Sequence, residues 1–171
     1  MKKLLSAAVL MAVLSGVAGA THEVCLKAGF VLNKGQGPFN SWLLIQESNY
    51  YIQDFISFGY ETQFSYYKTD SNDPAGAGVA TYPLNVFLNS KIKIIRQGLI
   101  RPYAGAGFGF YSSVKVYPDH YGWDKALATQ VMAGVSLGMG QRAAFQIEIK
   151  MLNTDMSGFK TKFILAAGVS Y

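Results

Sequence analysis

The stretch Thr161-Lys162-Phe163-Ile164-Leu165-Ala166-Ala167-Gly168-Val169-Ser170-Tyr171 decides the fold of this chain. Successive side chains of a β-strand point to opposite faces, so a strand has a period of two residues. One face of this stretch is apolar and ends on an aromatic ring, and the other is smaller or more polar. The apolar face holds Phe163, Leu165, Ala167, Val169 and Tyr171. The stretch therefore predicts a β-strand with one oily face.

The same alternation recurs in seven earlier segments, so we predict eight strands. The predicted strands are residues 23–32, 39–51, 55–68, 79–95, 101–117, 126–139, 143–153 and 161–171. In residues 143–153, for example, Phe145, Ile147 and Ile149 oppose Gln146 and Glu148. Residues 39–51 show the alternation least, because Trp42 to Ile45 is uniformly apolar.

The connections between these segments alternate between short and long. Residues 52–54, 96–100 and 140–142 form short connections, whereas 33–38, 69–78, 118–125 and 154–160 are longer and carry Gly, Asp, Asn or Pro. Outer-membrane barrels have short periplasmic turns and longer external loops, and a sheet can span a bilayer only when it closes. We therefore predict an all-β, eight-stranded antiparallel transmembrane β-barrel with both termini in the periplasm.

The first twenty residues have the three parts of a cleavable signal peptide. Lys2 and Lys3 form the charged start, residues 4–14 are apolar, and Ala18-Gly19-Ala20 offers small residues at the cleavage site. We expect cleavage between Ala20 and Thr21, which leaves residues 21–171 as one barrel domain in the cell outer membrane.

Composition excludes several other classes of protein. The net charge is +5, and it falls to +3 once Lys2 and Lys3 are removed, which is too mild to indicate nucleic-acid binding. Cys25 is the single cysteine, so an intramolecular disulfide is impossible. Eleven Tyr, eleven Phe and eighteen Gly with few charges suit a β-rich membrane protein.

Charged side chains on the inward phase of the predicted strands are the main candidate site. A basic residue facing lipid at the bilayer midplane costs about 2–4 kcal/mol, so these charges should face the lumen. We expect an ion network around Glu61 and Glu148 that fills the narrow lumen of an eight-stranded barrel. The predicted lumen charges are Lys27, Glu61, Lys91, Lys93, Lys115, Glu148, Lys150 and Lys162. Inward glycines, among them Gly105 and Gly134, would make room for Tyr103, Tyr111 or Met132.

Three motifs resemble the small outer-membrane β-barrel superfamily, which includes OmpW-like, opacity-type and OmpA-barrel-like proteins. They are Tyr-Tyr-Ile-Gln-Asp at 50–54, Gly-Tyr-Glu at 59–61 and Arg-Pro-Tyr-Ala-Gly-Ala-Gly-Phe-Gly-Phe-Tyr at 101–111. The resemblance implies that the barrel-assembly machinery reads the terminal strand, at positions matching Leu165, Ala167, Val169 and Tyr171. Tyr171 stands where Phe is commoner. The chain carries no peptidoglycan-binding domain, so tethering to the cell wall is not implied.

Two other features invite a chemical interpretation. Gly105-Ala-Gly107-Phe-Gly109 places its third glycine one residue early for a dinucleotide-binding loop, and no helix is predicted after it. His120 lies between Asp119 and Asp124 and is a candidate general base or metal ligand. No serine follows it at the spacing of lipid A deacylases. Aromatic residues near strand ends are interpreted as a membrane-interface girdle. They are Tyr50, Tyr51, Tyr60, Tyr66, Tyr67, Tyr82, Tyr111, Tyr117, Trp123 and Tyr171.

Three functional hypotheses remain. The first is a non-enzymatic outer-membrane protein of structural or surface-interaction type, whose long loops meet an extracellular ligand that the sequence does not identify. The second is a narrow OmpW-like conduit for small or hydrophobic molecules, and the third is a lipid-modifying enzyme built around His120. We expect no cofactor and no metal; the expected partners are outer-membrane lipid, lipopolysaccharide and the barrel-assembly machinery, without nucleic acid.

Overall fold

Eight strands make up the computed structural model, which describes residues 22–32, 41–53, 55–68, 79–95, 98–117, 119–139, 143–154 and 161–171. The strands are β1 (His22–Leu32), β2 (Ser41–Gln53), β3 (Ile56–Lys68), β4 (Ala80–Lys93), β5 (Ile100–Val116), β6 (Tyr121–Gly138), β7 (Ala144–Thr154) and β8 (Lys162–Ser170). Seven agree with the sequence prediction to within two residues at each end, and β6 begins five residues earlier than predicted.

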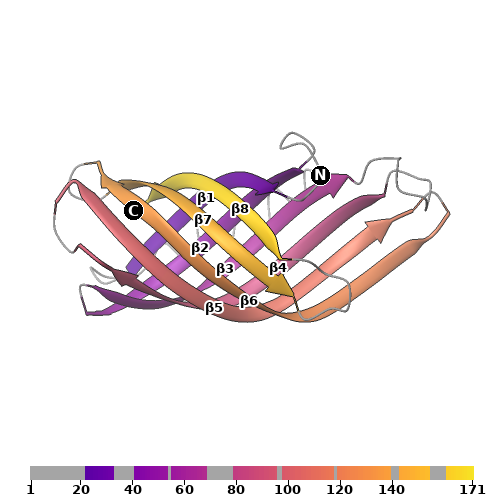
Figure 1. Ribbon diagram of the computed structural model, residues 1–171, viewed down its shortest axis with the longest axis horizontal. Helices are drawn as coiled ribbons and strands as arrows, with labels where there is room; N and C mark the ends of the chain where they lie inside the picture. The colour runs from indigo at the N-terminus through magenta and orange to yellow at the C-terminus, as the bar shows by residue number, and fades with distance from the viewer. Residues whose placement is uncertain are drawn as a thin grey trace.

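The eight strands close into one antiparallel barrel. Each strand pairs with the next along the chain, and β1 pairs with β8 from Cys25↔Ser170 to Leu32↔Phe163. Two backbone hydrogen bonds between Val24 and Tyr171 hold the start of β1 against the end of the chain, so both lie at the same end of the barrel (Figure 1). The predicted all-β, eight-stranded antiparallel barrel is therefore confirmed. The described residues include no helix that is long and apolar enough to cross a membrane.

The polarity of the barrel is inverted relative to that of a water-soluble protein. On β7, Gln146, Glu148 and Lys150 are buried, whereas Ile147 and Ile149 are exposed. The same holds on β5, where Phe108 and Phe110 are 65% and 67% exposed. A contiguous apolar exterior around a polar interior is what a hydrocarbon environment requires of a barrel.

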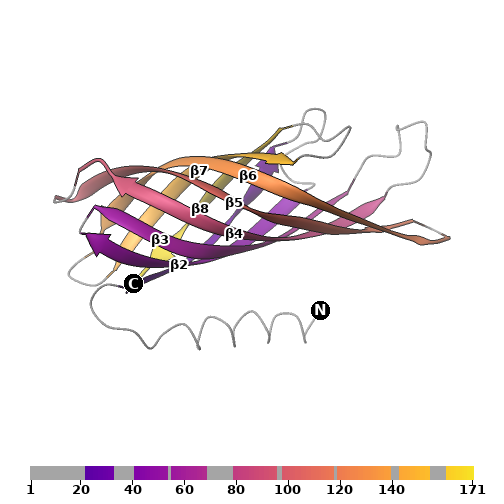
Figure 2. The same ribbon diagram turned by 90° about the horizontal axis from the view of Figure 1, so that it is seen from below.

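The strands differ strongly in length, and this makes the barrel lopsided. The β5 and β6 strands have 17 and 18 residues, but β7 and β8 have 11 and 9. The β5–β6 hairpin therefore projects beyond β7 and β8 at the end of the barrel opposite the chain's C-terminus (Figures 1 and 2). Residues 118–125 were predicted to form a long loop, and this is wrong: Tyr121 to Lys125 continue β6 because they remain paired with β5.

Several predictions fall on residues outside the described ranges. They are the signal peptide with its cleavage site between Ala20 and Thr21, and most of the connections at 33–38, 69–78 and 154–160. The signal peptide and the placement of both termini in the periplasm stay predictions.

Candidate functional site in the barrel lumen

Three lysines and three glutamates meet in the middle of the lumen, and we call these six residues the central ion cluster: Lys27, Glu47, Glu61, Lys91, Glu148 and Lys150. They come from five strands, β1, β2, β3, β4 and β7. All six side chains are buried, with at most 8% of a side chain exposed. Their formal charges cancel. A buried charge is tolerated when it is paired and hydrogen-bonded, so the cluster forms a neutral polar core.

Glu148 is the hub of the central ion cluster. Its carboxylate lies 3.1 Å from the Nζ atoms of both Lys27 and Lys91 and 3.0 Å from that of Lys150. Each lysine also has a second carboxylate partner. Lys27 and Lys91 contact Glu47 at 2.9 and 2.5 Å, and Lys150 contacts Glu61 at 2.5 Å. The six ion pairs thus cross-link strands on opposite sides of the barrel.

Tyr103 covers the cluster on the side nearer the chain's C-terminus. Its hydroxyl donates to Glu148 at 2.9 Å, and the Nζ of Lys91 lies 4.9 Å from the centre of its ring. Gly134 makes room for this ring: a Cβ there would lie 2.6 Å from the Tyr103 hydroxyl and from the Ile147 carbonyl oxygen. The prediction that inward glycines accommodate Tyr103 is confirmed at this position.

A layer of amides continues the network on the other side of the cluster. Asn89 donates to Glu61 at 2.7 Å and accepts from Gln130 at 2.8 Å. Gln63 donates to Gln130 at 2.9 Å, and Asn85 donates to Gln63 at 3.1 Å. Amide side chains carry both donors and acceptors, so this layer joins the carboxylates to uncharged surroundings.

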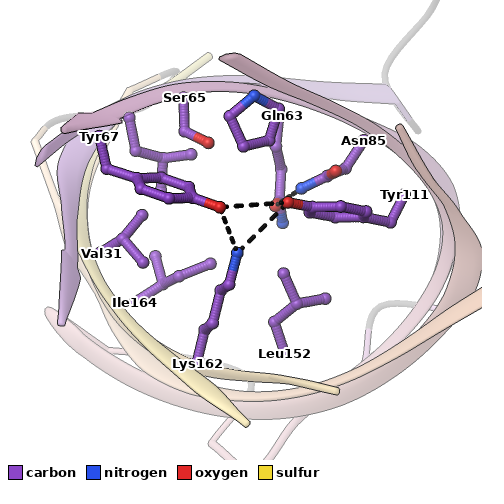
Figure 3. A pocket seen from close by; sticks show the side chains of 11 residues that line it. Val31, Gln63, Ser65, Tyr67, Asn85, Tyr111, Leu152, Lys162 and Ile164 are labelled. Carbon is purple, nitrogen blue, oxygen red and sulfur yellow. Dashed lines mark hydrogen bonds between the residues drawn. The ribbon is translucent and has the colours of Figure 1, made fainter. Parts of the chain in front are cut away.

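An apolar layer lies beside these amides, and residues of both kinds line the same part of the lumen. Buried side chains from several strands pack together there: Val31, Leu43, Ile45, Phe87, Leu152 and Ile164. In the same part of the lumen the Lys162 ammonium lies 3.2 and 3.3 Å from the hydroxyls of Tyr67 and Tyr111, and we call these three residues the tyrosine site (Figure 3). The space between these side chains is about 10 Å³, which holds about one water molecule.

The predicted lumen charges fall into two groups. Lys27, Glu61, Lys91, Glu148 and Lys150 come together as expected. The remaining three lie apart from the central ion cluster. Lys93 sits 3.9 Å from the centre of the Tyr51 ring, Lys115 contacts Asp124 at 2.6 Å in the projecting hairpin, and Lys162 lies in the tyrosine site of Figure 3. The single network around Glu61 and Glu148 is therefore smaller than predicted.

Glu47 is the cluster member that sequence reasoning missed. It lies on β2, the strand whose alternation was weakest, because Leu43 and Ile45 face the apolar layer of the lumen. The surplus of inward lysines over inward glutamates was the available signal for a missing carboxylate. The girdle interpretation is wrong for Tyr67 and Tyr111, which are buried in the lumen, whereas Tyr66 and Tyr82 face outward with ring centres 5.3 Å apart.

The other predicted sites have simpler surroundings. On β8, Leu165 and Val169 face outward and Ala167 is half-buried, and Tyr171, which follows β8, is exposed; their role as an assembly signal stays a prediction. His120 hydrogen-bonds Asp119 at 2.7 Å, and this contact holds the pKa of the exposed Asp119 carboxyl below its ordinary value. Asp124, the other candidate partner of His120, is bound to Lys115 instead.

The charges and polar groups of the described lumen are satisfied mainly by one another. Among the described residues, no three His, Cys, Asp or Glu side chains are arranged to hold a metal ion. The carboxylates and lysines of the central ion cluster neutralise one another, and the space at the tyrosine site has room for about one water molecule. Ion pairs and hydrogen bonds therefore cross-link the strands through the described lumen.

Comparison with known proteins identifies the fold and goes no further. No protein-family model and no curated protein matches the chain. Among solved structures, Neisserial surface protein A matches with a TM-score of 0.65 and 14% identity, over 90% of this chain and 98% of that one. The N-terminal β-barrel domain of Pseudomonas aeruginosa OprF matches with a TM-score of 0.59 and 15% identity, over 86% and 95%.

Two further matches make the same point. Ail, the attachment invasion locus protein of Yersinia pestis, has a TM-score of 0.52 and 12% identity, over 88% of this chain and 96% of that one. A de novo designed transmembrane β-barrel scores 0.53 at 14% identity, over 91% and 97%. A designed sequence shares the architecture, so the likeness defines a fold and not an activity. The fold is that of the small eight-stranded outer-membrane barrels.

Proposed function

We propose that this chain is an integral outer-membrane protein whose barrel is a closed, non-enzymatic platform that displays its long connections and the β5–β6 hairpin outside the cell. The filled lumen is the observation that carries this proposal. A lumen closed by the central ion cluster, the amide layer and the apolar layer supports the structural or surface-interaction role over transport.

The inward glycines support the same conclusion. Positions that would widen an empty barrel are occupied by neighbouring side chains. A Cβ at Gly107 would lie 1.9 Å from the Asn89 side-chain oxygen, and one at Gly105 would lie 2.9 Å from the Lys91 side chain. The glycines therefore accommodate the polar network, and neighbouring side chains fill the space beside them.

The two ends of the barrel differ in the length of their connections, and this difference supports one orientation of the barrel in the membrane. In outer-membrane barrels the longer connections face outward. The described ends of the chain lie at the same barrel end as the short turns, which supports placing that end in the periplasm. Leu165, Ala167 and Val169 on β8, with Tyr171 directly after it, would then serve as the terminal signal for barrel assembly. Outer-membrane lipid and lipopolysaccharide would surround the exposed apolar wall.

Planar-bilayer recording with refolded protein tests the closed lumen directly. We expect no steady conductance above that of protein-free bilayers. A stable channel would overturn the closed platform and favour the OmpW-like conduit. Lipid A from cells carrying His120→Ala should match lipid A from wild-type cells by mass spectrometry. A difference would overturn the non-enzymatic assignment and favour the lipid-modifying alternative.

A further inference from the structure

Among the described residues, the projecting hairpin ends in a β-strand edge that pairs on one side only. From Tyr121 to Leu127, β6 pairs with β5 without a register shift, and its ladder with β7 begins only at Ala128, opposite Thr154. Among the described residues, no strand lies on the other side of these seven residues. We call residues 121–127 the free edge, which Figure 2 shows at the projecting end of β6.

Side-chain contacts hold the free edge in strand form. Lys115 binds Asp124 at 2.6 Å across the hairpin, and the indole N–H of Trp123 donates to the Ser112 hydroxyl at 2.8 Å. At the tip the ring of Tyr117 stacks on that of His120 with centres 4.3 Å apart. A strand that is already ordered loses little conformational entropy when it pairs with another strand.

An ordered strand edge is a template for another strand, because its backbone N–H and C=O groups lie in an open row. Proteins usually protect such an edge with proline, a bulge or charged side chains. The free edge, Tyr-Gly-Trp-Asp-Lys-Ala-Leu, contains no proline and no bulge, and of its two charges Asp124 is neutralised by Lys115, which leaves Lys125. Its outward side chains are mainly large and apolar, with Tyr121 78% and Trp123 66% exposed. Lys125 lies with its Nζ 4.5 Å from the Trp123 ring centre.

We propose that the free edge pairs antiparallel with the free edge of a second copy of this chain. With Asp124 at the centre of the pairing, all seven residues are matched. Trp123 of each copy then faces Lys125 of the other, so the cation–π contact seen within the hairpin is repeated between copies. Tyr121 faces Leu127, and the two central Asp124 carboxylates are each neutralised by Lys115 of the same copy.

The direction of this pairing determines where the second copy resides. Barrels in one membrane insert in the same direction, so their β6 strands run parallel to one another. Antiparallel pairing of two β6 edges requires barrels in two facing membranes. The inference rests on the proposed function, because the hairpin must project outside the cell. The chain then mediates contact between facing outer membranes through a symmetric pair of strands.

Vesicles of two fluorescent colours, each carrying the refolded protein, test the contact. Wild-type vesicles of both colours should form mixed aggregates, and protein-free vesicles should stay apart. To test the register, vesicles of one colour carry Trp123→Cys and vesicles of the other colour carry Lys125→Cys, each together with Cys25→Ser. The two kinds of vesicle are mixed and then oxidised. Side chains directly opposite on paired strands have Cβ atoms about 4.5–5.5 Å apart, but diagonal neighbours are about 7–8 Å apart. The mixed pair should therefore cross-link several-fold more than Trp123→Cys with itself.

Val114→Cys is the matched control, because it faces outward directly opposite Trp123 but lies on β5, one strand away from the free edge. It should not cross-link. Wild-type vesicles that stay apart, or cross-linking of Val114→Cys as strong as that of the mixed pair, would overturn the proposal. Labelling of Lys125→Cys on intact cells by an impermeant maleimide separates the two proposals. Absence of labelling contradicts the external hairpin itself, whereas labelling without vesicle contact contradicts only the strand pairing.

Discussion

Replacing Glu148 with Gln removes the hub of the central ion cluster and leaves its shape nearly unchanged. Three buried lysines would then share two carboxylates, Glu47 and Glu61. Removing one partner of a buried ion pair destabilises a protein by about 3–5 kcal/mol. Every lysine of the cluster keeps a second carboxylate within 2.9 Å, so we expect the low end of this range, about 3 kcal/mol. This corresponds to about a hundred-fold change in the unfolding equilibrium constant.

The assay is urea unfolding in lipid vesicles, followed by the change in gel migration between folded and unfolded barrel. Adding Lys27→Met restores equal charge and leaves two intact pairs, Lys91 with Glu47 and Lys150 with Glu61. The double variant should be less destabilised than the sum of the single variants, with a coupling of about 0.5–3 kcal/mol. Asp119→Asn, at an exposed carboxylate, is the control and should stay within about 0.5 kcal/mol of wild type. A Glu148→Gln variant as stable as this control would refute the reasoning.

Three further predictions address other parts of the barrel. Ile149→Arg should lower the free energy of unfolding by about 2–4 kcal/mol, because Ile149 faces outward on β7; equal stability in the same urea assay would contradict a lipid-facing wall. Gly134→Ala should cost about 1–3 kcal/mol, since its methyl group would collide with the Tyr103 ring and a backbone oxygen; a neutral or stabilising effect would contradict the packing. His120→Ala should return the pKa of Asp119 upward toward its ordinary value in a carboxyl-carbon NMR titration. Because the pKa of Asp119 is lowered, the Asp119–His120 contact is favourable at pH values above the ordinary pKa of Asp and is lost on acidification. An unchanged titration of Asp119 in the variant would contradict the contact.

The fold was predictable because lipid imposes the same alternation on every strand. On β7 and β8 the outward residues are mostly apolar, and this phase determines which face of each strand turns to the lumen. The alternation fails where the lumen itself is apolar. Leu43 and Ile45 face inward beside Phe87, and this hides the phase of β2. Glu47 was therefore the one central carboxylate without a sequence signal on its own strand.

The end of the β5–β6 hairpin was not predictable for a different reason. Residues 118–125 combine Pro, Gly and two Asp, a composition typical of turns. Asp124 is nevertheless compatible with a strand because Lys115 binds it across the hairpin, and Gly122 lies opposite Lys115 in the ladder. Cross-strand pairs of this kind depend on register, which composition does not reveal. The position of Lys162 between two tyrosines likewise depends on strands β3 and β5 meeting β8 through the lumen.

Spin labels placed along β7 give the most direct test of the claim that hydrocarbon surrounds the barrel and polar side chains fill it. Single cysteines at Ile147, Ile149 and Met151 would represent the outward face, and cysteines at Gln146 and Leu152 the lumen. Our account predicts collisions with oxygen dissolved in the bilayer at the three outward positions and strong protection at the two inward ones. Oxygen access at Gln146 and Leu152, with protection at Ile147 and Ile149, would contradict it.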